Sequence, residues 1–171
     1  FNNCSWHIIY NYPLSSSFTT KRNFRKKFKI PDNNTLIVYQ GVLQRGRGIK
    51  QLLYLSSIMS NVSAVVIGGG QSQKKYIAFS KKLKVYHKTV FIQKIPYIDL
   101  MGYTASCDIG WGLIKNCGIS NYFSLPNKLF EYSLAGLPTI ISNLPNMKRV
   151  VEKYNLGLVV SEKNVDEQRD A

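Results

Sequence analysis

Residues 126–141 read PNKLFEYSLAGLPTII, and this stretch shows the pattern on which the whole chain is built. Residues 126–134 have helical periodicity, and Gly136 and Pro138 end the helix. The β-branched run at residues 139–141 then predicts a short buried strand. A helix that passes directly into a buried strand is the repeating unit of an α/β protein.

The same alternation extends over most of the chain. Short strands are expected at residues 36–39, 64–67, 90–92, 108–110, 139–141 and 158–160. These runs are nearly all hydrophobic, as in a parallel sheet that helices cover on both faces. We therefore expect a doubly wound, Rossmann-like α/β domain with a parallel sheet of about six strands. Ligands of such folds lie at the carboxyl ends of the strands, here in the loops at residues 40–48, 68–71, 93–96 and 111–127.

Both ends of the chain fall outside this pattern. Residues 1–20 predict an interdomain linker after a missing N-terminal domain, and residues 21–171 predict the α/β domain, expected to be cut short at both ends. The basic run at residues 21–29, KRNFRKKFK, places Phe24 and Phe28 one helical turn apart and predicts a helix lying on the domain. Residues 161–171 are polar without an apolar period and are expected to fray.

The composition limits where the protein works and what it binds. Cys4, Cys107 and Cys117 have neither paired nor metal-ligand spacing, so we expect no disulfide framework, no zinc site and a reducing, cytoplasmic location. No apolar stretch approaches the ~20 residues that span a bilayer. The net charge of +14 leaves nucleic acid, an anionic membrane surface and a phosphate-bearing substrate open as partners, beside a lysine-rich solvated surface.

The helix at residues 126–134 carries the side chains best suited to chemistry. On a helical wheel, Asn127, Lys128 and Glu131 share one side. The other side holds Leu129, Phe130, Ser133 and Leu134. The start of a helix attracts phosphate, Lys128 adds positive charge, and Glu131 can accept hydrogen bonds from two ribose hydroxyls. The segment predicts a nucleoside diphosphate site, with an ordinary surface pair between Lys128 and Glu131 as the alternative.

Residues 131–142, EYSLAGLPTIIS, resemble the signature of family 4 glycosyltransferases, which have the GT-B fold and belong to glycosyl transferases group 1. In that signature a Glu precedes Gly-x-Pro-x-x-x-Ser, and residues 126–132 are similar to bacterial surface-polysaccharide members. The resemblance covers about residues 10–160 and includes residues 39–41, 45–48, 66–70, 95–96 and 105–108. It implies the C-terminal half of a GT-B enzyme, which binds a nucleotide-diphosphate sugar.

The resemblance also implies roles for individual residues. Glu131 would hold the donor ribose, and Arg47 would grip the donor diphosphate with help from Arg45, because a guanidinium binds phosphate oxygens bidentately. The remaining donor contacts would come from Gly41, Gly69, Asn127 and Lys128. Two positions depart from the family: Phe123 replaces a Glu that contacts the transferred sugar, and Val42 replaces a basic residue of the phosphate grip.

Membership of this family would further imply a retaining, hexosyltransferase-like reaction without a metal ion or cofactor. The acceptor would be a glycan or a lipid-linked molecule, held by the missing N-terminal domain, so the isolated chain is expected to be inactive. The basic run at residues 21–29 would help to hold the enzyme at an anionic membrane surface, in the cytoplasm on the inner face of the plasma membrane.

Two other functions compete with this interpretation. A nucleic-acid-binding module accounts for the basic run but for nothing after residue 35, so no nucleic acid is expected as a partner. A nicotinamide-dependent oxidoreductase shares the fold class, but the glycines at residues 68–70 follow the second strand and lack the Gly-x-Gly-x-x-Gly spacing. We interpret these glycines as a close approach of the backbone to the donor.

Overall fold

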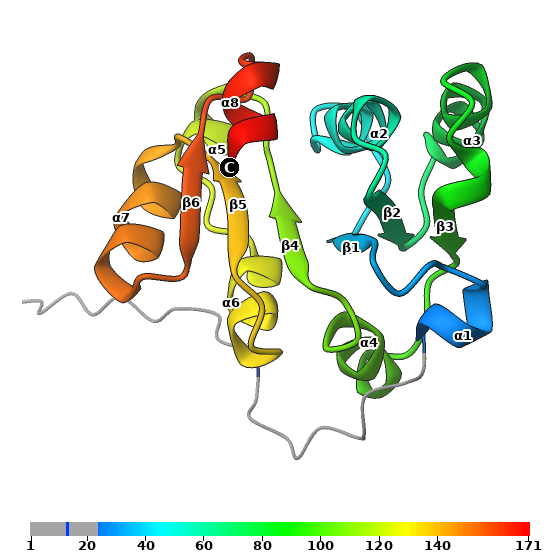
Figure 1. The fold of residues 1–171 in the computed structure, drawn as a ribbon. Helices are drawn as coiled ribbons and strands as arrows, with labels where there is room; N and C mark the ends of the chain where they lie inside the picture. The colour runs from blue at the N-terminus through cyan, green and yellow to red at the C-terminus, as the bar shows by residue number, and fades with distance from the viewer. Residues whose placement is uncertain (1–12, 14–23) are drawn as a thin grey trace, which may run out of the picture.

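A parallel six-stranded sheet forms the centre of the protein (Figure 1). The structure is a computed structural model that describes residue 13 and residues 24–171. The strand order is β3-β2-β1-β4-β5-β6, and every neighbouring pair is parallel. The strands are β1 (Thr35–Gln40), β2 (Val62–Ile67), β3 (Thr89–Ile92), β4 (Ile109–Gly112), β5 (Thr139–Ser142) and β6 (Gly157–Val160). The expected doubly wound, Rossmann-like sheet is confirmed.

The helices lie in two layers, one on each face of the sheet (Figure 1). On β1, Ile37 and Tyr39 point into the core under α2 and α3. Leu36 and Val38 point the other way, into the core beside α1, α4 and α6. This alternation is the period of a strand buried on both sides. The helices are α1 (Phe24–Phe28), α2 (Ile49–Ile58), α3 (Gln73–Lys82), the 3-10 turn η1 (Tyr86–Lys88), α4 (Tyr97–Thr104), α5 (Ile119–Tyr122), α6 (Asn127–Leu134), α7 (Pro145–Tyr154) and α8 (Val165–Asp170).

The strand order reverses between β1 and β4. From β1 the chain adds β2 and β3 on one side, and it then returns to place β4, β5 and β6 on the other. The loops that leave β1 and β4 therefore diverge at the carboxyl edge of the sheet, and the crevice between them is where ligands of this fold class bind.

The basic run is partly built into the domain. The side chain of Phe24 in α1 is 1% exposed, and its ring meets Tyr103 edge-on at 5.8 Å between centroids. Arg25 Nη2 donates to Asp108 Oδ2 at 2.7 Å, so this arginine anchors α1 to the domain. The predicted helix lying on the domain is confirmed. Residues 1–12 and 14–23, which include nearly all of the predicted linker and the start of the basic run, lie outside the described residues.

The C-terminal segment forms a helix that its polar sequence did not indicate. The Asn164 side chain accepts hydrogen bonds from two backbone N–H groups in the first turn of α8, at 3.1 and 3.2 Å. Gln168 is buried and donates from Nε2 to the Ser161 carbonyl oxygen at 2.7 Å. The expectation that residues 161–171 fray was wrong, because polar caps and side-chain hydrogen bonds, rather than an apolar face, fix this helix.

Among the described residues, no helix combines the length and the apolar character needed to cross a bilayer. Cys107 and Cys117 are free thiols, the first buried and the second exposed. Cys4 lies outside the part of the chain that the structure describes.

Candidate functional site

Glycines bring the loops after β1 and β2 into close contact. A Cβ on Gly68 would lie 2.0 Å from the carbonyl oxygen of Gly41, and a Cβ on Gly70 would lie 2.6 Å from that of Leu43. Both glycines also have positive φ angles, 139° and 153°, which L side chains rarely adopt. A Cβ on Gly69 would meet nothing within 4 Å. Gly68 and Gly70 are therefore needed for packing, whereas Gly69 borders open space.

The loop that carries the two arginines is held from the β4 side. Trp111 is fully buried, and its Nε1 donates to the carbonyl oxygen of Gly48 at 2.8 Å. The backbone N–H of Lys115 donates to the carbonyl oxygen of Gly46, also at 2.8 Å. These two contacts fix the backbone on either side of Arg47 and join the loops that border the crevice.

Arg45 and Arg47 lie in different surroundings. Burial raises the pKa of Tyr76 in α3, and the charge of Arg45 opposes that rise. Burial likewise raises the pKa of Tyr39 at the end of β1, and there Arg47 is the opposing charge. Burial and then Arg47 lower the pKa of Lys128 in α6. Arg47 thus belongs to the β1–α6 side of its loop, and Arg45 to the α3 side.

Tyr132 fixes α6 against the sheet. A Cβ on Gly110 of β4 would lie 2.4 Å from ring atoms of Tyr132, so the ring occupies the space that the glycine leaves. The Tyr132 hydroxyl accepts from the backbone N–H of Gln40 at 3.1 Å. It also lies 3.1 Å from the carbonyl oxygen of Val38 and 3.2 Å from that of Trp111. One side chain therefore ties α6 to both strands at the reversal point.

The buried side of α6 differs from the helical-wheel expectation. Lys128, Leu129 and Tyr132 are buried, whereas Ser133 is exposed. The expected places of Lys128 on the polar side and of Ser133 on the apolar side were wrong. Because the Tyr132 ring enters the core, it turns the residue one turn earlier, Lys128, toward the sheet as well.

Lys128 is a buried cation at the carboxyl edge. Its Nζ lies 3.7 Å from the centroid of the Tyr39 ring and 3.7 Å from where a Cβ on Gly41 would stand. Burial, and then repulsion from Arg47, lower the pKa of Lys128 to about 7, while Glu131 acts in the opposite direction. An amine with this pKa becomes more fully charged when an anion binds beside it.

Glu131 is held by a chain of hydrogen bonds. Thr104 Oγ1 donates to Gln40 Oε1 at 2.6 Å, which fixes the orientation of the amide. Gln40 Nε2 therefore faces Glu131 and donates to its Oε2. The carboxylate is half-buried and keeps acceptor capacity for a ligand, since a carboxylate has about four acceptor positions. Tyr97 adjoins it, because burial and then the charge of Glu131 raise the pKa of Tyr97.

The structure gathers most of the predicted donor residues at one edge. Those that lie together are Gly41, Arg47, Lys128 and Glu131. Gly69 is in the adjoining turn, Asn127 is exposed at the start of α6, and Arg45 lies toward α3.

The sequence did not single out three further residues of this edge, Gln40, Thr104 and Tyr97. A polar residue at the end of an otherwise buried strand was a usable signal for Gln40. Nothing in the sequence marks Thr104, since α4 brings it to Gln40 only in the folded chain. Tyr97 follows Pro96 at the start of α4, and a single exposed aromatic residue is a weak signal.

The two positions that depart from the family pattern are exposed. Phe123 is 54% exposed, and its carbonyl oxygen accepts from Asn146 Nδ2 at 2.7 Å. Val42 is exposed as well, and its carbonyl oxygen accepts from the Tyr39 hydroxyl at 2.8 Å. Neither side chain can supply charge, so the charges at this edge come from Arg47, Lys128 and Glu131.

Comparison with known proteins assigns most of the chain to one protein family. The sequence model of the family described as glycosyl transferases group 1 matches residues 20–171. The chain belongs to this family. An uncharacterized glycosyltransferase of Methanocaldococcus jannaschii is 24% identical over 168 residues, which cover 93% of this chain and 42% of that protein.

Solved glycosyltransferases resemble this group 1 domain in fold. The chain superposes on WaaG, described as a glycosyltransferase of lipopolysaccharide biosynthesis, with a TM-score of 0.68 at 18% identity, covering 85% of this chain and 40% of WaaG. Anabaena HepE, in complex with UDP and glucose, gives 0.69 at 17% identity, covering 85% and 39%. Sucrose-phosphate synthase of Thermosynechococcus elongatus gives 0.70 at 16% identity, covering 90% and 39%. The chain thus spans about two-fifths of the length of these relatives.

Proposed function

We propose that this group 1 glycosyltransferase chain is a donor domain, which binds a nucleotide-diphosphate sugar between β1 and β4. One observation carries the proposal: Gln40 orients the Glu131 carboxylate on α6 beside the buried Lys128 cation. A carboxylate suits two ribose hydroxyls, and cations beside it suit a diphosphate. The complex of HepE with UDP and glucose supports this class of ligand.

The proposed reaction is a retaining transfer of the sugar without a metal ion. The bond between the anomeric carbon and the diphosphate oxygen breaks, the acceptor hydroxyl oxygen bonds to that carbon, and the hydroxyl proton leaves with the diphosphate. Lys128 and Arg47 stabilise the negative charge that develops on the departing diphosphate, because they occupy the carboxyl edge before the reaction begins.

We further propose that a second domain holds the acceptor, which would be a glycan or a lipid-linked molecule. The matched relatives are more than twice as long as this chain, and WaaG is described as acting in lipopolysaccharide biosynthesis. Transfer would then take place in the cytoplasm or at the inner face of the plasma membrane. The present chain alone would bind donor without turnover, since catalysis needs the acceptor at the donor carbon.

A thermal-shift panel tests the donor proposal. UDP, GDP, ADP and CMP are compared with NAD, because a ligand that binds only the folded state raises the melting temperature. We expect at least one nucleoside diphosphate to stabilise the chain and NAD to have no effect. Stabilisation by NAD, with no response to any nucleoside diphosphate, would refute the donor site and favour an oxidoreductase.

A further inference from the structure

Positive charge is concentrated in one half of the domain. Residues 33–98, which form β1, α2, β2, α3, η1 and β3, contain no Asp or Glu. The same residues contain ten cationic side chains: Arg45, Arg47, Lys50, Lys74, Lys75, Lys81, Lys82, Lys84, Lys88 and Lys94. All nine acidic residues of the chain therefore lie outside this stretch of sequence, and those nearest to α2 come from the C-terminal segment that carries α8.

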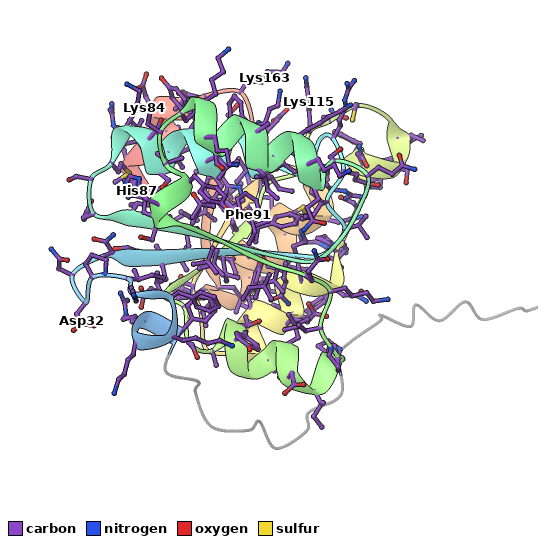
Figure 2. All side chains as sticks on the ribbon, turned by 90° about the vertical axis from the view of Figure 1, so that its right-hand side faces the viewer. Asp32, Lys84, His87, Phe91, Lys115 and Lys163 are labelled. Carbon is purple, nitrogen blue, oxygen red and sulfur yellow. The ribbon has the colours of Figure 1, made fainter. Side chains whose placement is uncertain are left out.

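A groove between α2 and α3 collects several of these charges. Its volume is about 740 Å³, and its charged lining consists of Arg45, Arg47, Lys50, Lys75, Lys82 and Lys115, with no carboxylate. Figure 2 shows α3 at the top of the domain, with Lys84 and Lys115 on the same outer side. Asp32 lies away from that side, near α1.

Three lysines of the groove lining stand without a paired carboxylate among the described residues. Within the part of the chain that the structure describes, no ion pair involves Lys50, Lys75 or Lys82. Lys50 instead places its Nζ 5.2 Å from the centroid of the Phe79 ring. Like charges gathered around one groove repel each other, so an anionic ligand would bind there favourably.

The side chains that line the groove favour phosphate groups over single-stranded nucleic acid. Binding of single strands relies on aromatic faces on which bases stack. Tyr76 is buried and donates its hydroxyl to the Gln44 carbonyl oxygen at 2.7 Å, and the Phe79 ring is covered by Lys50. Lysines beside a partly exposed apolar side chain, such as Lys50 over the Phe79 ring, instead resemble a surface that meets lipid headgroups.

We propose that the groove between α2 and α3 binds the phosphate headgroups of an anionic lipid surface. The domain then contacts the membrane through its α2–α3 layer rather than through the basic run at residues 21–29, whose Arg25 is already paired with Asp108. The groove shares Arg45 and Arg47 with the edge that carries the donor site, whereas Lys50, Lys75 and Lys82 line the groove alone, so variants of these three lysines test the inference independently of Lys128 and Glu131.

Vesicle binding by charge-neutralised variants tests the proposal. The groove variant is Lys50→Gln/Lys75→Gln/Lys82→Gln, and its matched control on α7 is Lys148→Gln/Arg149→Gln/Lys153→Gln. A third variant, Lys21→Gln/Lys26→Gln/Lys29→Gln, removes three charges from the basic run. Co-sedimentation is measured at low salt with phosphatidylcholine vesicles, with and without phosphatidylglycerol. Thermal melting checks that each variant is folded. If Lys50→Gln lowers the melting temperature of the groove variant, the double variant Lys75→Gln/Lys82→Gln replaces it.

We expect salt-sensitive binding to the anionic vesicles only. The groove variant should bind about 100-fold more weakly, since each Lys or Arg near such a surface contributes about 1 kcal/mol. The other two variants should lose much less. An equal loss in all three variants, a larger loss in the basic-run variant, or equal binding to neutral vesicles would overturn the proposal. Two further results, each in the absence of vesicle binding, would also overturn the proposal. One is stabilisation of the protein by inorganic phosphate, and the other is binding of the protein to duplex DNA.

Discussion

The buried lysine of the donor site makes nucleotide-sugar binding depend on pH. The pKa of Lys128 is about 7 in the free protein, against 10.5 for an ordinary lysine. Near neutral pH only about half of the molecules therefore carry the charge that the diphosphate needs. If binding requires the charged form, affinity should fall about 50-fold between pH 7 and pH 9, and the fall approaches tenfold per pH unit only well above pH 7.

Isothermal titration with a nucleotide sugar measures this effect. The two phosphates of a nucleotide sugar are fully ionised throughout the range, so the pH dependence reports on the protein. Binding should also take up protons, about half of one per site near pH 7 and close to one at higher pH, which buffers of different ionisation enthalpy reveal. The matched variant is Lys128→Met, which keeps an unbranched side chain but removes the titrating group. It should bind more weakly, with no such pH dependence.

The low pKa of Lys128 also makes the stability of the ligand-free protein depend on pH. Stability should rise with pH, whereas nucleotide-sugar affinity should fall. The unfolded chain holds a proton on Lys128 up to about pH 10.5, whereas the folded protein releases it near pH 7. The contribution of this residue to the free energy of unfolding therefore rises between these two values and is lowest below pH 7. Met at this position should abolish that rise. A nucleotide-sugar affinity that stays constant from pH 7 to pH 9, or that falls equally in wild type and Lys128→Met, would refute the reasoning.

Two pairs of variants test the placement of other residues. Arg47→Ala should weaken nucleotide-sugar binding about 10- to 150-fold, because a hydrogen bond to a charged group contributes about 1.5–3 kcal/mol. Arg45→Ala should change the affinity less than about threefold. Calorimetric titration of each variant with the nucleotide sugar measures the difference. Gly110→Ala should lower the free energy of unfolding by about 1–3 kcal/mol in urea, because the added methyl group would lie 2.4 Å from the buried Tyr132 ring. The control Gly69→Ala adds a methyl group in open space and should cost less than about 0.5 kcal/mol. Equal losses within either pair would contradict the corresponding contacts.

Periodicity predicts the fold of this chain well because its strands are buried on both faces. A strand such as β2, with every residue buried, leaves little ambiguity between a parallel sheet and other arrangements. The polar helix α8 could not be predicted this way. Its order comes from the Asn164 cap and the buried amide of Gln168, which leave no apolar period in the sequence.

The candidate site was predictable where one segment carries it. Lys128 and Glu131 stand three residues apart on α6, so the sequence alone places them near each other. The burial of Lys128 was not predictable, because it depends on how Tyr132 packs against Gly110 of β4. The orientation of Glu131 likewise depends on Gln40 of β1, a contact between residues far apart in the sequence.

Titration of the preferred nucleotide sugar into wild type and Glu131→Gln tests the central claim most directly. The amide can still accept a hydrogen bond from Gln40, so the fold should be nearly unaffected, while the charged acceptor of the ribose hydroxyls is lost. The account predicts affinity about 10- to 150-fold weaker at an almost unchanged melting temperature. Unchanged affinity with a lowered melting temperature would contradict it, and would make Glu131 part of an ordinary surface pair.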